Sequence, residues 1–209
     1  MASRNYGLKE IYSWKCDRLE LPEEWANHLG RMPHNFRMLI AGESGHGKTE
    51  YIIKLAKMLA TYLGKVHYNS TEQGKSADFQ DAVIRNNMDE LDAGKFMLAD
   101  ANQRTFAGWF NKVQKPNSGR VLLLDSMDYM HLSFIQYQQI HERFKRQKAI
   151  IINSWGDPMA GDAKRIRYTS DYKVKVKDYK AYIRSRHGGN EPFVIRDKKT
   201  KGSKERVRK

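Results

Sequence analysis

Eight consecutive residues have the types and the spacing that bind a polyphosphate. They match the pattern G-x-x-x-x-G-K-[ST] and are Gly42, Glu43, Ser44, Gly45, His46, Gly47, Lys48 and Thr49. In this pattern the glycines let the backbone curl, so that successive N–H groups converge on phosphate oxygens. Lys48 would reach the β- and γ-phosphates, and the hydroxyl of Thr49 would bind magnesium. We therefore expect ATP and Mg²⁺ as ligands, with a chance match in a glycine-rich turn as the alternative.

The sequence on either side of this loop has the form that a phosphate site requires. Residues 37–41 form an apolar run that predicts a strand, and residues 50–63 place apolar side chains at helical spacing. A loop that joins a strand to a helix start directs backbone N–H groups and the positive end of the helix toward one point. Both flanks therefore argue against a chance match.

Two acidic residues at the ends of later strands could complete the chemistry. Asp125 follows the apolar run at residues 121–124, which is the Walker B pattern, and its carboxylate would hold magnesium through a water molecule. Glu72 follows the predicted strand at residues 66–70 and could orient or deprotonate an attacking water. The alternatives are an ordinary strand-end aspartate and a solvated turn glutamate, and Glu43 is a rival for the role of base.

Strands and helices alternate along most of the chain. Apolar runs predict strands at residues 37–41, 66–70, 95–99, 121–125 and 149–152. Helical spacing predicts helices at residues 50–63, 76–88, 105–115 and 133–148. We expect an α/β fold with a mostly parallel central sheet flanked by helices. Residues 153–168 have the composition of a loop, and strands predicted at 172–177, 179–186 and 193–195 would form an antiparallel C-terminal hairpin extension.

The charge balance suggests a polyanionic partner and helps to divide the chain. The 209 residues carry a formal net charge of +14, and nucleic acid is the usual partner of such a basic protein. Residues 198–209 hold seven basic residues and one acidic residue, which predicts a disordered tail. This tail is either a solubilising terminus or an electrostatic arm for DNA or RNA. We expect one domain over residues 28–197, preceded by an N-terminal extension at residues 1–27.

Cysteine content and hydropathy bear on the compartment. Cys16 is the single cysteine, so no internal disulfide can form, which fits a reducing cytosol. The first residues lack the apolar core of a signal peptide, and no stretch approaches the roughly 20 apolar residues that span a bilayer. We therefore expect a cytoplasmic protein without a membrane partner.

Taken together, the loop, the strand-end aspartate and the glutamate resemble those of RecA-like P-loop ATPases. The closest likeness is to the core of DnaB-type replicative helicases and to RadA-type ATPases, over about residues 28–197. The run Leu122–Ser126 resembles their hydrophobic Asp-Ser motif, and Ser70–Glu72 matches the position of their catalytic glutamate. The resemblance implies a RecA-like fold, hydrolysis of ATP, and Glu72 as the catalytic base.

The resemblance also suggests roles for residues farther along the chain. Asn153 lies where the family places a sensor of the γ-phosphate. Residues 155–167 correspond to a DNA-facing loop, whose basic residues here are Lys164, Arg165 and Arg167. Residues 183–189 resemble a segment whose two cations reach the ATP site of the neighbouring subunit, which makes Arg184 and Arg186 candidate trans-acting fingers. Alternation along a strand would put both on one face, and a solvated basic hairpin is the alternative.

These features predict a Mg²⁺-dependent ATPase that assembles head-to-tail, holds ATP between subunits and acts on nucleic acid, with single-stranded DNA favoured. The chain lacks the helical N-terminal domain of full replicative helicases. A compact stand-alone ATPase, such as a phage would encode for the host cytoplasm, therefore fits better than a processive helicase. Two other classes stay open: a P-loop kinase of a small substrate, and a nucleic-acid-binding scaffold that uses ATP to set its shape.

Overall fold

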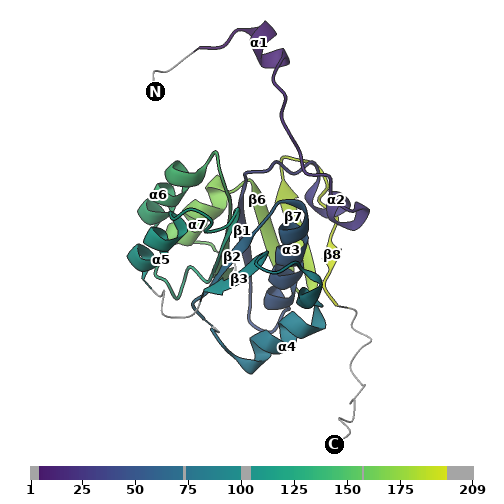
Figure 1. Ribbon diagram of the computed structural model, residues 1–209, viewed down its shortest axis with the longest axis vertical. Helices are drawn as coiled ribbons and strands as arrows, with labels where there is room; N and C mark the ends of the chain where they lie inside the picture. Colours follow the sequence, from purple (N-terminus) through teal and green to yellow (C-terminus); the bar gives the residue numbers. More distant parts are fainter. Residues whose placement is uncertain (1–4, 73, 100–104, 157, 197–209) are drawn as a thin grey trace, which may run out of the picture.

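A computed structural model describes residues 5–72, 74–99, 105–156 and 158–196. Within these residues the chain forms an eight-stranded sheet with the order β3-β2-β4-β5-β1-β6-β7-β8 (Figure 1). The strands are β1 (Arg37–Gly42), β2 (Val66–Ser70), β3 (Phe96–Ala99), β4 (Val121–Asp125), β5 (Ala149–Trp155), β6 (Tyr172–Lys177), β7 (Lys180–Ser185) and β8 (Phe193–Val194). The pairings from β3 to β6 are parallel, whereas β6–β7 and β7–β8 are antiparallel. This topology confirms the predicted mostly parallel sheet with an antiparallel C-terminal hairpin.

Helices cover both faces of the sheet. They are α1 (Leu8–Tyr12), α2 (Glu23–Leu29), α3 (Lys48–Tyr62), α4 (Ala77–Arg85), α5 (Phe106–Val113), α6 (Phe134–Phe144) and α7 (Gly161–Thr169), with a 3-10 turn η1 at Met88–Glu90. Apolar residues of α2, α3 and α4 belong to one buried cluster, and those of α5, α6 and α7 belong to a second one. Figure 1 shows the two helical layers on opposite sides of the strands. Helix α1 contributes no buried residue and projects from the body of the molecule (Figure 1).

The apolar runs arise because the central strands are buried on both sides. In β4, Val121 and Leu123 pack in the first cluster, whereas Leu122 and Leu124 pack in the second. Successive side chains of a strand point to opposite faces, so a strand between two helical layers needs apolar residues at every position. The apolar run is followed by Asp125, which therefore lies at the carboxyl end of β4.

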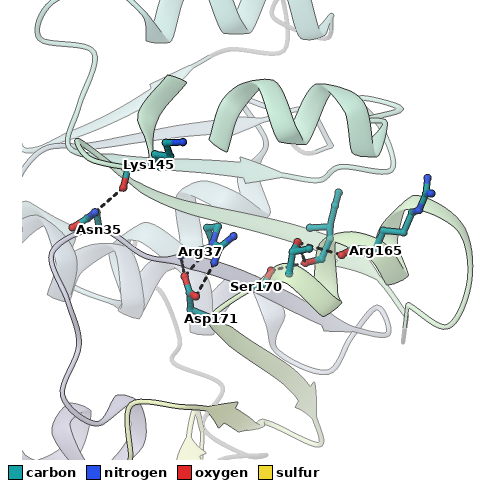
Figure 2. Close-up of polar contacts among 8 residues, drawn as sticks. Asn35, Arg37, Lys145, Arg165, Ser170 and Asp171 are labelled. Carbon is teal, nitrogen blue, oxygen red and sulfur yellow. Dashed lines mark hydrogen bonds and ion pairs between the residues drawn. The ribbon is translucent and has the colours of Figure 1, made fainter. Parts of the chain in front are cut away.

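A bidentate ion pair connects the starts of β1 and β6. The guanidinium of Arg37 donates from Nε and Nη2 to the carboxylate of Asp171, at 3.1 and 2.9 Å, and the Arg37 backbone N–H donates to the same carboxylate at 2.9 Å (Figure 2). The backbone N–H of Asp171 donates to the carbonyl of Arg37 at 2.9 Å. These bonds fix the register at which the hairpin joins the parallel sheet.

The structure differs from the sequence-based expectation after β5. Residues 161–169, expected to be loop, form helix α7, whose Ile166 is buried in the second cluster. A single buried residue gives too little apolar periodicity to predict a helix. Strand β7 ends at Ser185, so Arg186 lies beyond the strand and the expected alternation does not extend to it. The predicted tail at residues 198–209 lies outside the described residues.

Candidate nucleotide site

The predicted phosphate loop connects β1 to the start of α3. Gly45 and Gly47 have φ values of +79° and +93°, in the left-handed region that favours glycine. Helix α3 begins at Lys48, and its N-cap residue, Gly47, supplies no side-chain hydrogen bond to the first turn. The first N–H groups of a helix lack intrahelical acceptors and carry the positive end of the dipole. Such a helix start favours an anion beside the loop.

A cavity of about 770 Å³ opens beside this loop and gathers most of the predicted site residues. The predicted residues that line it are Glu43, Ser44, Gly45, Gly47, Lys48, Thr49, Glu72, Asp125 and Asn153. They come from the loop and from the ends of β2, β4 and β5, which are parallel strands that end at one edge. Ligands collect at this edge in open α/β sheets.

His46 contacts the turn between β6 and β7 and does not line the larger cavity. Its Nδ1 accepts a hydrogen bond from the backbone N–H of Asp178 at 3.0 Å, and its carbonyl accepts one from Tyr179 at 3.2 Å. Gly42 and His46 line a smaller neighbouring cavity of about 210 Å³. The turn between β6 and β7 thus packs against the phosphate loop. The sequence did not indicate this contact.

The carboxylate of Asp125 is buried and held by two donors. The hydroxyl of Tyr68 and the Nδ2 of Asn153 donate to its two oxygens. Only 3% of Asp125 is exposed. Burial raises the pKa of Asp125, although these two hydrogen bonds and the charge of Lys48 act in the opposite direction. The carboxylate therefore has a fixed orientation within the cavity.

Lys48 lies among acidic groups at the base of the cavity. Its Nζ donates to the carbonyl of Gly42, at the start of the loop. Burial lowers the pKa of Lys48, and the negative charges of Glu72 and Asp125 oppose that change. Lys48, Glu72 and Asp125 all line the same cavity.

Glu72 is oriented by a residue that sequence analysis did not assign to the site. The indole Nε1 of Trp155 donates to Oε2 of Glu72 at 3.3 Å. Trp155 is itself held, because its backbone N–H donates to Asp128 at 2.8 Å and its ring contacts Tyr129 edge-on. The side chain of Glu72 is otherwise exposed and lines the cavity. A carboxylate so placed can accept a proton from a water molecule in the cavity.

The residues present fit a hydrated divalent cation. Thr49 and Asp125 line the cavity with oxygen donors of the kind that Mg²⁺ prefers. Oδ1 of Asn153 is buried and has no hydrogen-bond partner among the described residues. Such an orphaned acceptor beside Asp125 suits a metal-bound water. In this structure the amide of Asn153 donates to Asp125, and its role as a γ-phosphate sensor stays a prediction.

Seven further residues line the cavity without any signal in the sequence. They are Glu50, Asp78, Ala82, Arg85, Gly156, Tyr179 and Arg196. Arg85 is engaged by Glu50, whose carboxylate accepts from its Nε at 2.8 Å. Tyr179 packs under the loop, where a Cβ added to Gly47 would lie 2.9 Å from its ring. Apart from Glu50, these residues are distant in sequence from the phosphate loop, so only the tertiary fold brings them to it.

The basic residues predicted to contact nucleic acid or the ATP site of a neighbouring subunit do not line the nucleotide cavity. Lys164, Arg165 and Arg167 lie on helix α7, and not on a loop. Arg165 is 3.8 Å from Asp162 and lies over the ring of Phe134. Arg184 lines a separate groove together with Arg167, and neither Arg184 nor Arg186 lines the nucleotide cavity. Within one chain, the described structure does not bring the candidate fingers to the phosphate loop.

Comparisons with solved structures agree with this architecture. Flagellar accessory protein FlaH from Methanocaldococcus jannaschii superposes with a TM-score of 0.58 and 16% identity, over 85% of this chain and 92% of FlaH. The KaiC-like protein PH0186 from Pyrococcus horikoshii OT3 superposes with a TM-score of 0.55 and 15% identity, over 82% of this chain and 88% of that one. No protein-family model and no curated protein sequence matches the chain.

The chain therefore has the RecA-like α/β fold that the motifs had predicted. The identities are low, so these likenesses concern the fold. Within the described residues, the structure contains no helix that is long and apolar enough to cross a membrane.

Proposed function

We propose that the protein binds ATP with Mg²⁺ and hydrolyses it. The observation that carries this proposal is the convergence of Lys48, Thr49, Asp125 and Glu72 on one cavity at the carboxyl ends of parallel strands. A phosphate loop alone would support binding, whereas hydrolysis also requires a metal anchor and a group that activates water. Asp125 and Glu72, the candidates for these two roles, line the same cavity.

Each residue has a distinct part in the proposed reaction. The N–H groups at the start of α3 and the ammonium of Lys48 bind the phosphate oxygens, where negative charge accumulates during transfer. Thr49 and Asp125 would hold the magnesium ion, Asp125 through a water molecule. Mg²⁺, when bound, neutralises charge on the β- and γ-phosphate oxygens. Glu72 accepts the proton of the attacking water while Trp155 keeps its carboxylate in place.

We further propose that two copies of the chain complete the site. Two arginines of the described residues line the cavity, and one of them, Arg85, is already engaged by Glu50. A neighbouring copy packed head-to-tail would supply Arg184 or Arg186, which are exposed on this copy. A positive charge supplied in this way can raise the rate of phosphoryl transfer by about 10³-fold or more. We also propose single-stranded nucleic acid as the partner of this assembly, as in DnaB-type and RadA-type ATPases, and the cytoplasm as its compartment. The net charge of +14 supports a polyanionic partner.

The substitution Glu72→Gln tests the proposed reaction. Because glutamine cannot accept the proton, we expect ATP turnover to fall by about 100-fold or more. Binding of a fluorescent ATP analogue should persist, since the phosphate loop is unchanged. Glu142→Gln on the exposed side of α6 is the matched control and should keep full turnover. Undiminished turnover by Glu72→Gln would remove Glu72 from the role of base.

A further inference from the structure

The β6–β7 hairpin carries a basic face that does not line the nucleotide cavity of its own chain. Alternation places Val174, Val176, Ala181 and Ile183 in the buried core. The opposite face carries Lys173, Lys175, Lys177, Lys180, Tyr182 and Arg184, which we call the basic hairpin face. All of these side chains are exposed except that of Lys173, which is half-buried. One face of the hairpin thus belongs to the core, and the other presents positive charge.

The register of the hairpin places like charges directly opposite each other. Lys173 pairs with Arg184, and Lys177 pairs with Lys180. Like charges in such positions destabilise a sheet, and neither strand contains an acidic residue. Burial lowers the pKa of Lys173, and the charges of Arg186 and Arg167 lower it further. An anion bound to this surface would reduce the repulsion between the paired cations.

No described acid neutralises the cross-strand cations. Within the part of the chain that the structure describes, Lys173, Lys177 and Arg184 are in no ion pair. Asp171, the acid beside Lys173, is engaged by both arms of the Arg37 guanidinium (Figure 2). The positive charges of Lys173, Lys177 and Arg184 are therefore available to a ligand.

Helix α7 turns part of this face into a groove. The groove has a volume of about 460 Å³ and is lined by Leu39 and Ala41 of β1, by residues of the basic hairpin face, and by Arg167 of α7. Arg167 and Arg184 thus line one groove, although they come from different elements. A recessed channel with cations on both sides suits a linear polyanion better than a flat bilayer surface.

We propose that this groove binds the phosphodiester backbone of a single-stranded nucleic acid, with Tyr182 stacked on a base. Alternate residues of a strand repeat every ~7 Å, which is similar to the distance between phosphates of an extended single strand. Tyr182 lies between the cationic positions and is 45% exposed, so its ring can serve as a stacking platform. The inference rests on the nucleic-acid partner proposed above and gives it a surface.

A triple substitution of cations that line the groove tests it in the full-length protein. The hairpin variant carries Arg167→Gln, Lys173→Gln and Lys175→Gln, which together remove three charges without touching Arg184 or the nucleotide cavity. Binding of a labelled oligo-dT is followed by fluorescence anisotropy without nucleotide, over a series of salt concentrations. We expect the dissociation constant to rise about tenfold or more, and the salt dependence to weaken by about two units of slope.

A second triple variant removes the same net charge from elsewhere. Lys9→Gln, Lys112→Gln and Lys115→Gln neutralise exposed lysines of α1, of α5 and of the segment after α5. We expect this control to bind oligo-dT almost as the parent protein does. Equal losses in both triple variants would mean that net charge alone attracts DNA, and no loss in the hairpin variant would place the site elsewhere. Either outcome overturns the proposal.

Tyr182 separates stacking from charge. Tyr182→Ala should weaken oligo-dT binding several-fold with an unchanged salt dependence, and Tyr182→Phe should restore it, because base stacking requires the ring and not the hydroxyl. Equal binding by the Ala and Phe variants would overturn the stacking contact. Anionic vesicles serve as a competing probe, and preference for them over oligo-dT would overturn the choice of nucleic acid. ATP turnover is measured separately, so an inactive ATPase that still binds oligo-dT through this face would refute only the proposed function.

Discussion

At the residue scale, the hydrogen bonds around Asp125 show how the site is held in place. Tyr68 lies on β2 and Asn153 on β5, so strands on both sides of β4 donate to the same carboxylate. The backbone N–H and the hydroxyl of Thr71 also donate to the carbonyl of Asp125, the latter at 3.0 Å. Protein donors therefore fix the orientation of the Asp125 carboxylate, which limits the reorganisation that binding of the proposed magnesium ion would require.

Trp155→Phe tests whether the indole positions the proposed base. The variant keeps an aromatic ring but removes the N–H that donates to Glu72. We expect kcat for ATP hydrolysis to fall about 3- to 10-fold with little change in KM, because the carboxylate would lose its orientation while the phosphate loop stays intact.

Steady-state kinetics of Trp155→Phe and of a matched control variant show whether the indole positions Glu72. Trp14→Phe changes a half-exposed tryptophan that follows α1, away from the cavity, and should leave kcat unaltered. A rise in KM without a fall in kcat would show that Trp155 contributes to ATP binding and not to the position of Glu72.

At the element scale, the pair formed by Arg37 and Asp171 joins the hairpin to the parallel sheet (Figure 2). Both side chains are mostly buried, and Asp171 accepts three hydrogen bonds from Arg37. Asp171→Asn should lower the free energy of unfolding by about 2 kcal/mol, since a half-buried arginine loses its charged partner. Urea denaturation measures this change, and the surface variant Glu142→Gln should show none.

The same pair predicts a dependence of stability on pH. Burial alone would raise the pKa of Asp171, but the hydrogen bonds and the charge of Arg37 outweigh it, so the pKa lies below its ordinary value. A depressed pKa in the folded state stabilises the protein above the ordinary value of about 3.9 and ceases to do so as the pH falls through the folded value. The stability difference between the parent protein and Asp171→Asn should therefore shrink below about pH 4. A difference that stays constant down to pH 2 would contradict this assignment.

Another contact between elements depends on a single glycine. Gly30 ends α2 with φ +70°, and a Cβ there would lie 2.4 Å from the carbonyl oxygen of His187, in the turn after β7. Gly30→Ala should lower the free energy of unfolding by about 3 kcal/mol, because both the backbone conformation and the contact become unfavourable.

Gly94→Ala separates the cost of the backbone conformation from the cost of the close contact. Gly94 has φ +80°, but a Cβ there would meet nothing within 4 Å. We expect it to cost about 1 kcal/mol, which is the conformational penalty alone. Thermal and urea unfolding of the two variants compare them directly, and equal losses would show that the approach of α2 to the turn is not a close contact.

At the scale of the whole molecule, head-to-tail assembly predicts that two defective proteins complement each other. Lys48→Ala removes the phosphate lysine, and a variant with Arg184→Ala and Arg186→Ala removes the proposed fingers. An equimolar mixture should hydrolyse ATP faster than the mean of the two separate preparations, because some interfaces then combine an intact cavity with intact fingers. For the parent protein, specific activity should rise with concentration. Additive activities and strict proportionality to concentration would contradict shared sites.

Local patterns accounted for much of the fold. The phosphate loop could be predicted because its glycines, lysine and threonine act within eight consecutive residues. The parallel strands could be predicted because burial on both faces requires an apolar residue at each position, as in Val121–Leu124. Helix α7 could not, since only Ile166 is buried in it and periodicity needs several such residues.

The amino-acid sequence by itself determined the phosphate loop, the alternation of strands and helices, and the basic character of the chain. Only the tertiary structure decided that Trp155 holds Glu72, that Tyr179 supports the loop, and that Arg167 and Arg184 line one groove apart from the nucleotide cavity. The physical reason is the separation along the chain of the residues that determine each feature. Backbone conformation and burial leave a local periodicity in the sequence, whereas contacts between distant residues depend on strand order and register, which no local pattern encodes.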